Sequence, residues 1–220
     1  MNPGQEKAWA SRERYLVEVP RRETSTSIAE QAVVDWPAVF GRTAPLVVEI
    51  GSGTGDSLAE MAAGDPDRDH IAFEVFRPAL ASTMIKLNAQ SVGNVRLVDA
   101  DGVEGLARLF APGQVDELWT FFPDPWHKTR HHKRRLVDTE FAVLAASRLT
   151  PGGVWRIATD WDDYADHCRG VLDGHPHLIN LYADSGGTAP RPATRPLTKY
   201  ERRGIAAGRT VTDLAYGRRP

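Results

Sequence analysis

A glycine-rich turn follows a short hydrophobic run near residue 50. Residues 47–55 read Val-Val-Glu-Ile-Gly-Ser-Gly-Thr-Gly, and a stretch of helical periodicity comes next. Glycines in such a strand, turn and helix let the backbone approach a ligand and aim N–H groups at it. The spacing of Gly51, Gly53 and Gly55 differs from the Gly-x-Gly-x-x-Gly of dinucleotide sites, and the Glu49 carboxylate would repel a pyrophosphate. A cationic sulfonium ligand with an amino group fits better, which favours S-adenosylmethionine over NAD.

Acidic residues end the next two hydrophobic runs. Glu74 lies at the end of residues 70–75, where an acid in this kind of sheet hydrogen-bonds ribose hydroxyls. Asp99 and Asp101 lie two residues apart at the end of the third run, so both would point to one face and either could meet an adenine amino group. Asp101 is the preferred candidate. A single acid would be an ordinary helix cap, but acids at three successive strand ends indicate a nucleoside site.

The most distinctive segment is Phe121–Lys128, which reads Phe-Phe-Pro-Asp-Pro-Trp-His-Lys. It follows the fourth hydrophobic run, and in a doubly wound sheet the carboxyl end of that strand lies beside the ligand crevice. Asp124 would therefore face the ligand, with the flanking prolines fixing its backbone. Trp126 could stack on a base.

Basic residues concentrate in two places on a chain whose formal net charge is -2. Residues 127–135 hold five Lys and Arg and no acid, and residues 191–220 hold eight against Glu201 and Asp213. A solvated loop and tail would explain such charge, but its concentration favours a surface that contacts phosphates.

Two other chemistries have little support. His127, His131 and His132 lack a neighbouring carboxylate or cysteine that would complete a metal site, so we expect no metal. Cys168 is the only cysteine, which excludes an internal disulfide. It lies on an amphipathic stretch where a buried thiol is more usual than a nucleophile.

The elements that must position these residues alternate along the chain. Strands are predicted at 45–50, 70–75, 94–100, 115–122, 154–159, 178–183 and 210–216, and helices at 28–40, 56–63, 77–90, 102–110, 138–149, 161–173 and 199–207. Strict alternation over the first five strands predicts right-handed crossovers and a parallel sheet. We therefore expect an α/β fold with a Rossmann-like, doubly wound, mostly parallel sheet of seven strands.

The expected domain organisation is simple. Residues 1–40 form an N-terminal segment with the first helix, and residues 41–220 form the main domain with a basic part at 191–220. No apolar run reaches the roughly 18 residues of a membrane span, and the N-terminus has no apolar core of a signal peptide. We expect a cytoplasmic protein.

Several segments together resemble one known family, the bacterial tRNA (guanine-N7-)-methyltransferases, whose members use S-adenosylmethionine. The matching segments are Glu49–Gly55, Phe73–Val75, Phe121–Lys128 with Arg130–Arg135, Ala158–Trp161 and Thr198–Glu201. The string Phe-Phe-Pro-Asp-Pro-Trp-x-Lys is highly specific to this family, whereas the glycine turn is shared by methyltransferases in general. Tyr200 stands where the family commonly has phenylalanine, and the residues before Ile28 match no family motif.

The resemblance implies a class I methyltransferase fold with an antiparallel C-terminal strand, and it implies roles for the matching residues. The cofactor would contact Glu49, Gly51, Gly53, Glu74, Asp101 and Asp124, and Asp124 would also be catalytic. The substrate would contact Lys128, Asp160, Thr198, Lys199, Tyr200 and Glu201. Contacts to tRNA phosphates are expected from Arg130, Lys133, Arg134 and Arg135. The implied reaction methylates N7 of the variable-loop guanosine at tRNA position 46, giving 7-methylguanosine and S-adenosylhomocysteine.

Three other functions stay open at this point. The Pro-Asp-Pro-Trp segment is similar to the Asp/Asn-Pro-Pro-aromatic loop of amino-methylating enzymes, but it lacks two adjacent prolines. A nicotinamide oxidoreductase would need the dinucleotide glycine spacing, and a non-catalytic RNA-binding module would have no use for an acidic cofactor pocket. The sequence is compatible with a monomer or a homodimer.

Overall fold

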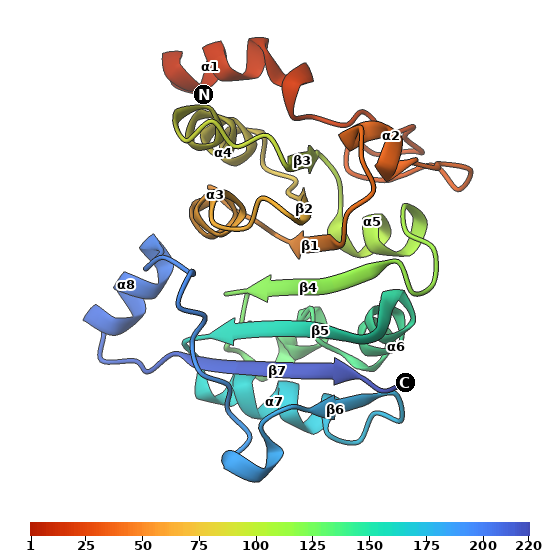
Figure 1. Cartoon of the computed structure of the whole chain (residues 1–220). Helices are drawn as coiled ribbons and strands as arrows, with labels where there is room; N and C mark the ends of the chain where they lie inside the picture. Colours follow the sequence, from red (N-terminus) through yellow and green to blue (C-terminus); the bar gives the residue numbers. More distant parts are fainter. The chain divides into compact units, whose positions relative to one another are not determined.

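The computed structural model describes residues 1–220, which form two compact units (Figure 1). The first unit comprises residues 1–111 and 193–196, and the second comprises residues 112–192 and 197–220. Each unit holds strands whose carboxyl ends carry sequence-predicted site residues. None of the helices has both the length and the apolar composition needed to cross a bilayer.

The first unit is built on three parallel strands in the order β3-β2-β1. These are β1 (Leu46–Ile50), β2 (Asp69–Phe73) and β3 (Val95–Val98). Every residue of β1 and β2 is buried, as a parallel strand covered on both faces requires. The helices of this unit are α1 (Pro3–Ala10), α2 (Trp36–Phe40), α3 (Asp56–Ala63), α4 (Arg77–Ala89) and α5 (Gly102–Arg108).

The N-terminal segment differs from the expected helix at 28–40. Only Trp36–Phe40 is helical, and it starts where the Asp35 side chain accepts a hydrogen bond from the backbone N–H of Ala38. The apolar residues that suggested helical periodicity, Ile28 and Ala32 among them, are buried in irregular backbone instead. Tertiary contacts fix this backbone, because the N–H of Ile28 donates to the carboxylate of Glu104 at 2.8 Å.

The segment before Ile28 has a structural role that no motif indicated. The backbone N–H of Leu97 donates to the carbonyl of Tyr15, and the N–H of Val17 donates to the carbonyl of Leu97, both at 2.9 Å. The segment thereby pairs with the outer side of β3. An uncovered strand edge is a template for unwanted pairing, and this bridge covers the edge of β3 at Leu97.

The second unit holds four strands in the order β4-β5-β7-β6. Strands β4 (Val115–Phe121) and β5 (Leu149–Thr159) are parallel, while β7 (Thr212–Arg218) runs against both β5 and β6 (Leu178–Asn180), as its reversed arrow in Figure 1 shows. Its helices are α6 (Thr139–Arg148), α7 (Asp162–Leu172) and α8 (Lys199–Ala206). Because β7 is antiparallel to β5, α8, which precedes β7, lies beside the arrowheads of β4 and β5 (Figure 1).

The expected α/β fold with seven mostly parallel strands and an antiparallel C-terminal strand is confirmed. Its elements differ from the sequence-based ranges mainly at their ends. Strand β5 begins at Leu149, before the Pro151-Gly152-Gly153 turn signal, and β6 ends at Asn180. The pairing of β4 with β5 passes from Val115–Leu149 directly to Glu117–Val154, so residues 150–153 bulge out and the turn signal marks a bulge inside β5.

Helix α5 packs closely on β2 because it carries a glycine at the contact. A Cβ atom added at Gly105 would lie 2.0 Å from the ring of Phe73, which itself packs edge-on against Phe110. The ring of Phe73 is fully buried. No side chain larger than hydrogen therefore fits at this helix position without displacing the core.

We expect Gly105→Ala to lower the free energy of unfolding by about 1–3 kcal/mol, because overpacking forces core side chains off their rotamers. The matched control is Gly170→Ala in α7, where an added Cβ meets nothing within 4 Å. That change should stabilise by about 0.5–1 kcal/mol, the helix preference of Ala over Gly. Urea unfolding of both variants measures the difference, and equal stabilities would contradict the packing argument.

Candidate functional site

The glycine turn between β1 and α3 has an open surface. Gly51, Gly53 and Gly55 have φ angles of 76°, 54° and 72°, which are strained for residues with a side chain. A Cβ at Gly51 or Gly53 would meet nothing within 4 Å, whereas at Gly55 it would collide with Thr83 of α4. Gly51 and Gly53 therefore leave room for a ligand against the backbone, and Gly55 allows α3 and α4 to approach.

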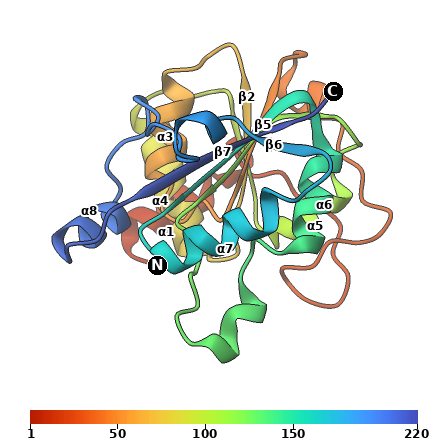
Figure 2. The same ribbon diagram turned by 90° about the horizontal axis from the view of Figure 1, so that it is seen from below.

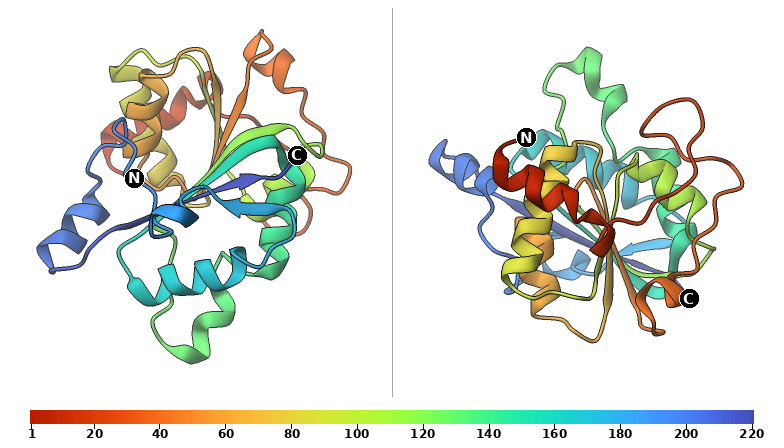
Figure 3. Two further views of the ribbon diagram at one scale, coloured as in Figure 1. Left: turned by 60° about the horizontal axis from the view of Figure 1, so that its bottom comes forward. Right: turned by 90° about the horizontal axis from the view of Figure 1, so that it is seen from above.

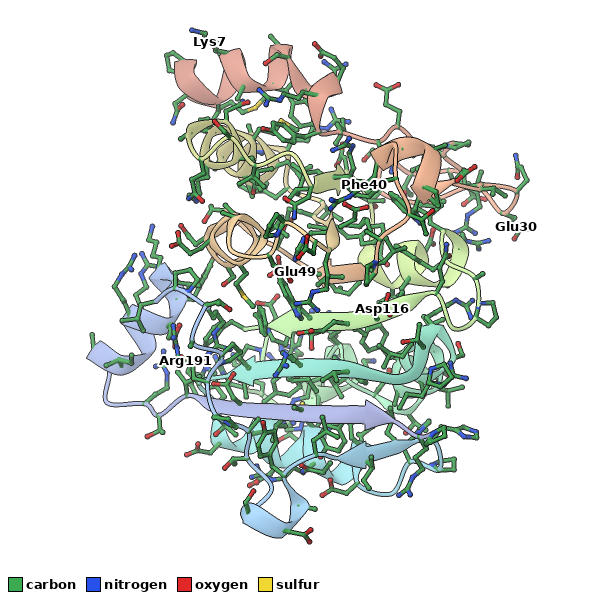
Figure 4. All side chains as sticks on the ribbon, in the orientation of Figure 1. Lys7, Glu30, Phe40, Glu49, Asp116 and Arg191 are labelled. Atoms are coloured by element: carbon green, nitrogen blue, oxygen red, sulfur yellow. The ribbon has the colours of Figure 1, made fainter.

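Glu49 is a buried carboxyl group at the end of β1, labelled in Figure 4. One of its oxygens, Oε2, is buried without a hydrogen-bond partner, and the same is true of the Ser52 hydroxyl in the turn. Burial, with a smaller contribution from the charge of Glu74, raises the pKa of Glu49 to about 8. An unpaired buried carboxyl group is costly, and a cationic ligand group beside it would supply the missing partner.

Glu74 ties the turn to the end of β2. Its Oε2 accepts the N–H of Gly53 at 2.8 Å, and its Oε1 accepts the N–H groups of Val75 and Phe76 at 2.8 and 2.9 Å. The side chains of Val75 and Phe76 are 49% and 63% exposed directly after this acid. Sequence reasoning missed these two apolar residues, although their position after a strand-end acid was a visible signal.

The two acids after β3 have different surroundings. Asp99 is buried and forms an ion pair with Arg77 at 2.9 Å. Asp101 is exposed, caps α5 by accepting the N–H of Glu104 at 2.9 Å, and donates its own N–H to the carbonyl of Thr26. Asp99 is therefore buried and paired with a cation, whereas Asp101 is exposed and uses one carboxylate oxygen, Oδ1, for the cap.

In the second unit, the loop after β4 holds Asp124 between two strained residues. Phe122 and Trp126 have φ angles of 52° and 49°, a left-handed conformation that is rare for large side chains. Asp124 is exposed, and its side chain forms no hydrogen bond or ion pair within the protein. Such strain persists only where the surroundings enforce it, and it gathers at functional sites.

The basic segment that follows forms a short 3-10 turn at Thr129–Arg134. Figures 2 and 3 show this green segment projecting beyond α7. Its outward basic side chains are Lys128, Arg130, Lys133 and Arg134. The guanidinium of Arg134 lies 5.0 Å from the centre of the Trp126 ring, which keeps that charge at the loop.

Arg135 differs from the expected phosphate contact. Its side chain is 2% exposed, forms an ion pair with Asp163 and donates to the carbonyl of Pro125 at 3.0 Å. The guanidinium hydrogen bond lowers the pKa of Asp163. Burial and pairing turn Arg135 inward, so we assign it to holding the loop rather than to the phosphate surface.

The predicted substrate residues at the start of α8 divide into two groups. Thr198 and Glu201 are buried: Thr198 caps the helix by accepting the N–H of Glu201 at 3.1 Å, and the Glu201 carboxylate pairs with Arg191 (labelled in Figure 4) at 2.8 Å. Lys199 and Tyr200 are exposed. The helix start is therefore anchored by one pair of residues and presents the other pair outward.

Much of the basic tail is paired within the protein. Arg191 and Arg209 form ion pairs with acids, Arg218 and Arg219 donate to backbone carbonyls, and Arg195 is buried. Arg209 pairs with Asp160, another predicted substrate residue, at 2.8 Å. The outward charge of the tail is concentrated on α8, at Lys199, Arg202 and Arg203.

Cys168 lies on the buried face of α7, as its sequence pattern predicted. Burial raises the pKa of its thiol to about 12. The thiol is therefore protonated at neutral pH, which makes it a poor nucleophile.

Solved methyltransferases share this fold. The chain is similar to the 16S rRNA (adenine(1408)-N(1))-methyltransferase of Catenulisporales acidiphilia, with a TM-score of 0.56, 13% identity, and coverage of 93% of this chain and 98% of that one. It is also similar to the 16S rRNA methyltransferase KamB, with a TM-score of 0.55, 17% identity, and coverage of 92% and 98%. The chain has the fold of the class I methyltransferases.

Sequence relatives define the family more closely. Residues 43–214 match a family model described as "Putative methyltransferase". The tRNA (guanine-N(7)-)-methyltransferase of Cutibacterium acnes is 52% identical over 99% of this chain and 79% of that protein. The enzyme of the same name from Pseudomonas putida is 47% identical over 84% of this chain and 77% of that protein. The chain belongs to the tRNA (guanine-N(7)-)-methyltransferase family.

The raised pKa of Glu49 predicts a pH dependence of stability. Between the ordinary pKa of 4.5 and about 8, the folded protein keeps a proton that the unfolded chain has lost. The free energy of unfolding therefore falls as pH rises through this window, by roughly 1 kcal/mol per pH unit. Glu49→Gln cannot ionise, so it should be more stable than the wild type at pH 8, with the difference shrinking toward pH 5.

Urea unfolding between pH 5 and 8 checks this expectation. The control is Glu60→Gln, which changes an exposed acid of α3 and should leave the pH profile unaltered. Parallel pH profiles for the wild type and Glu49→Gln would show that Glu49 is ionised in the folded protein.

Proposed function

We propose that this protein transfers the methyl group of S-adenosylmethionine to N7 of a guanosine in tRNA, the variable-loop guanosine at position 46. The observation that carries the proposal is the loop after β4. It presents an unpaired Asp124 between two left-handed residues and continues directly into an outward basic segment. A charged group beside an outward basic surface suits a polyanionic substrate. The reaction itself is the one carried by the name of the family to which the chain belongs.

The residues of the first unit fit the cofactor. The unpaired Oε2 of Glu49 suits the ammonium group of the methionine portion, and the open face of Gly51 and Gly53 gives its backbone access to the ligand. Glu74 and Asp101 are proposed to bind the ribose hydroxyls and the adenine amino group. When bound, S-adenosylmethionine supplies an electrophilic methyl group.

The acceptor needs little activation from the protein. Guanine N7 already presents a lone pair at the major-groove edge, so no general base is required. Methyl transfer is an in-line displacement, and the protein must align the two reactants and exclude water. The guanine ring acquires positive charge as the new bond forms. Asp124 is proposed to stabilise that charge or to position the base, and also to contact the cofactor.

The remaining substrate contacts come from the second unit. Lys128, Asp160 and the segment Thr198–Glu201 are proposed to recognise the nucleotide. Lys128, Arg130, Lys133 and Arg134, with the outward face of α8, are proposed to hold tRNA phosphates without reading the sequence. The variable-loop guanosine is stacked in folded tRNA, so the base would be extruded to react. A tRNA substrate also accords with a cytoplasmic location.

Methyl transfer from labelled S-adenosylmethionine to an unmodified tRNA transcript tests the proposal. The matched transcript carries adenosine in place of the variable-loop guanosine. Label only in the first transcript, released by aniline cleavage after borohydride reduction, supports methylation of N7 at that site. Label in both transcripts would indicate another base, and label in neither, with S-adenosylhomocysteine binding demonstrated by calorimetry, would refute a tRNA substrate.

Asp124→Asn should lower kcat about 10²–10³-fold, the effect of removing one group that stabilises transition-state charge. The amide keeps the size of the side chain but cannot offset a cation. Binding of tRNA by filter retention should stay near wild type, and the Kd for S-adenosylhomocysteine by calorimetry should rise far less than kcat falls, because the residues of the first unit still hold the cofactor. Asp184→Asn, at an exposed acid of the same unit, is the control. Near-normal turnover of Asp124→Asn would remove Asp124 from the mechanism.

The phosphate surface predicts salt-sensitive tRNA binding. Lys133→Ala and Arg134→Ala should each weaken binding and lower the slope of log K against log salt by about 0.7–0.9, one released counterion each. Arg135→Ala should instead lower the melting temperature, because it leaves Asp163 and the Pro125 carbonyl without their partner. Affinity that does not change between low and physiological salt would contradict the phosphate surface.

A further inference from the structure

Arg209 follows α8 and contacts two neighbouring residues of the Ala158–Trp161 motif. Its Nε donates to Oδ2 of Asp160 at 2.8 Å. Its guanidinium carbon lies 4.9 Å from the centre of the Trp161 ring. The backbone N–H of Arg209 donates to the carbonyl of Gly204 at 3.0 Å, which fixes its position relative to α8. One arginine thus bonds to a carboxylate and lies over the adjacent indole ring.

A tilted ring contact continues from Trp161 into the loop that carries Asp124. The ring of Trp161 lies 3.7 Å from the ring of His127, centre to centre, with an interplanar angle of 39°. His127 directly precedes Lys128 in that loop. Arg209, Trp161 and His127 therefore connect three segments that are far apart in sequence and that each supply a proposed substrate residue.

Asp160 is held from a second side by α8. A Cβ atom added at Gly204 would lie 2.5 Å from Oδ2 of Asp160, so the helix approaches this carboxylate where it carries no side chain. The side chain of Asp160 is only 13% exposed. Its Oδ1 makes no hydrogen bond within the protein, which leaves one acceptor oxygen for a ligand. The N1–H and 2-amino groups of guanine are donors that such an oxygen can accept.

We propose that Arg209 is a positioning residue for guanosine, which fixes the Asp160 carboxylate and the Trp161 ring so that Oδ1 of Asp160 faces the base. This inference rests on the proposed function. Arginine suits the task because its planar guanidinium can bond edge-on to a carboxylate and stack on an aromatic ring at once. A lysine would keep the charge but would lose the directed Nε bond and the broad contact of the guanidinium with the ring.

The test compares Arg209→Lys with Arg169→Lys, which changes another arginine of the second unit that pairs with an aspartate outside the site. Steady-state methylation of tRNA, calorimetric binding of S-adenosylhomocysteine and thermal melting are measured for each. We expect kcat/KM for tRNA to fall about 10–100-fold in Arg209→Lys, as misplaced contacts do. The Kd for S-adenosylhomocysteine should change less than about 2-fold, and Arg169→Lys should match the wild type. Assays are run well below the lowest melting temperature, where every variant is folded.

A double-mutant cycle with Asp160→Asn separates positioning from a direct phosphate contact. If Arg209 acts through Asp160, its replacement in the Asp160→Asn background should have little further effect. If Arg209 instead binds phosphate, Arg209→Lys stays active because the charge is kept, and the two changes are additive. That result overturns the inference while leaving the proposed function intact. A wild-type protein that does not methylate tRNA would refute the proposed function and, with it, this inference.

Discussion

The carboxylate of Glu74 organises the end of the first unit's sheet. By accepting three backbone N–H groups, it fixes the glycine turn against the end of β2. The same negative charge adds to the effect of burial on Glu49 and helps to raise its pKa. The glycine turn is therefore fixed by one carboxylate, Glu74, while the neighbouring Glu49 carboxyl group is left buried without a partner for Oε2. A protein tolerates such a group where a ligand completes it, which is why the cofactor is proposed to bind here.

In the second unit the equivalent constraint is backbone strain. Phe122 and Trp126 hold left-handed conformations on either side of Pro123 and Pro125. The loop is held by the hydrogen bond from Arg135 to the Pro125 carbonyl and by the tilted contact of His127 with Trp161. These contacts leave Asp124 exposed and unpaired. The two units thus hold their acidic groups in different ways. The first unit buries the Glu49 carboxyl group without a partner, and the second presents the Asp124 carboxylate on a loop with a strained backbone.

The basic residues of this protein fall into two groups, those that pair with acids inside the protein and those that are exposed to solvent. The net charge of the chain does not distinguish them. Arg135, Arg191 and Arg209 pair with acids and hold loops or helix ends in place. The outward lysines and arginines of residues 128–134 and of α8 have the exposure that phosphate contacts require. Because a guanidinium can pair with a protein carboxylate as readily as with a phosphate, only its surroundings decide which it does.

The sequence by itself determined the α/β fold, the glycine turn, the acids at three strand ends and the family. These depend on local patterns: hydrophobic periodicity, turn residues, and a motif contiguous in the chain. It did not determine that residues 28–35 are irregular, that Arg135, Thr198 and Glu201 are buried, or that Arg209 meets Asp160. Those outcomes depend on contacts between distant segments, such as Ile28 with Glu104 and Gly204 with Asp160. Hydrophobic periodicity indicates which residues are buried, but it does not indicate which residues they contact. Those contacts are decided only when distant segments of the chain pack together.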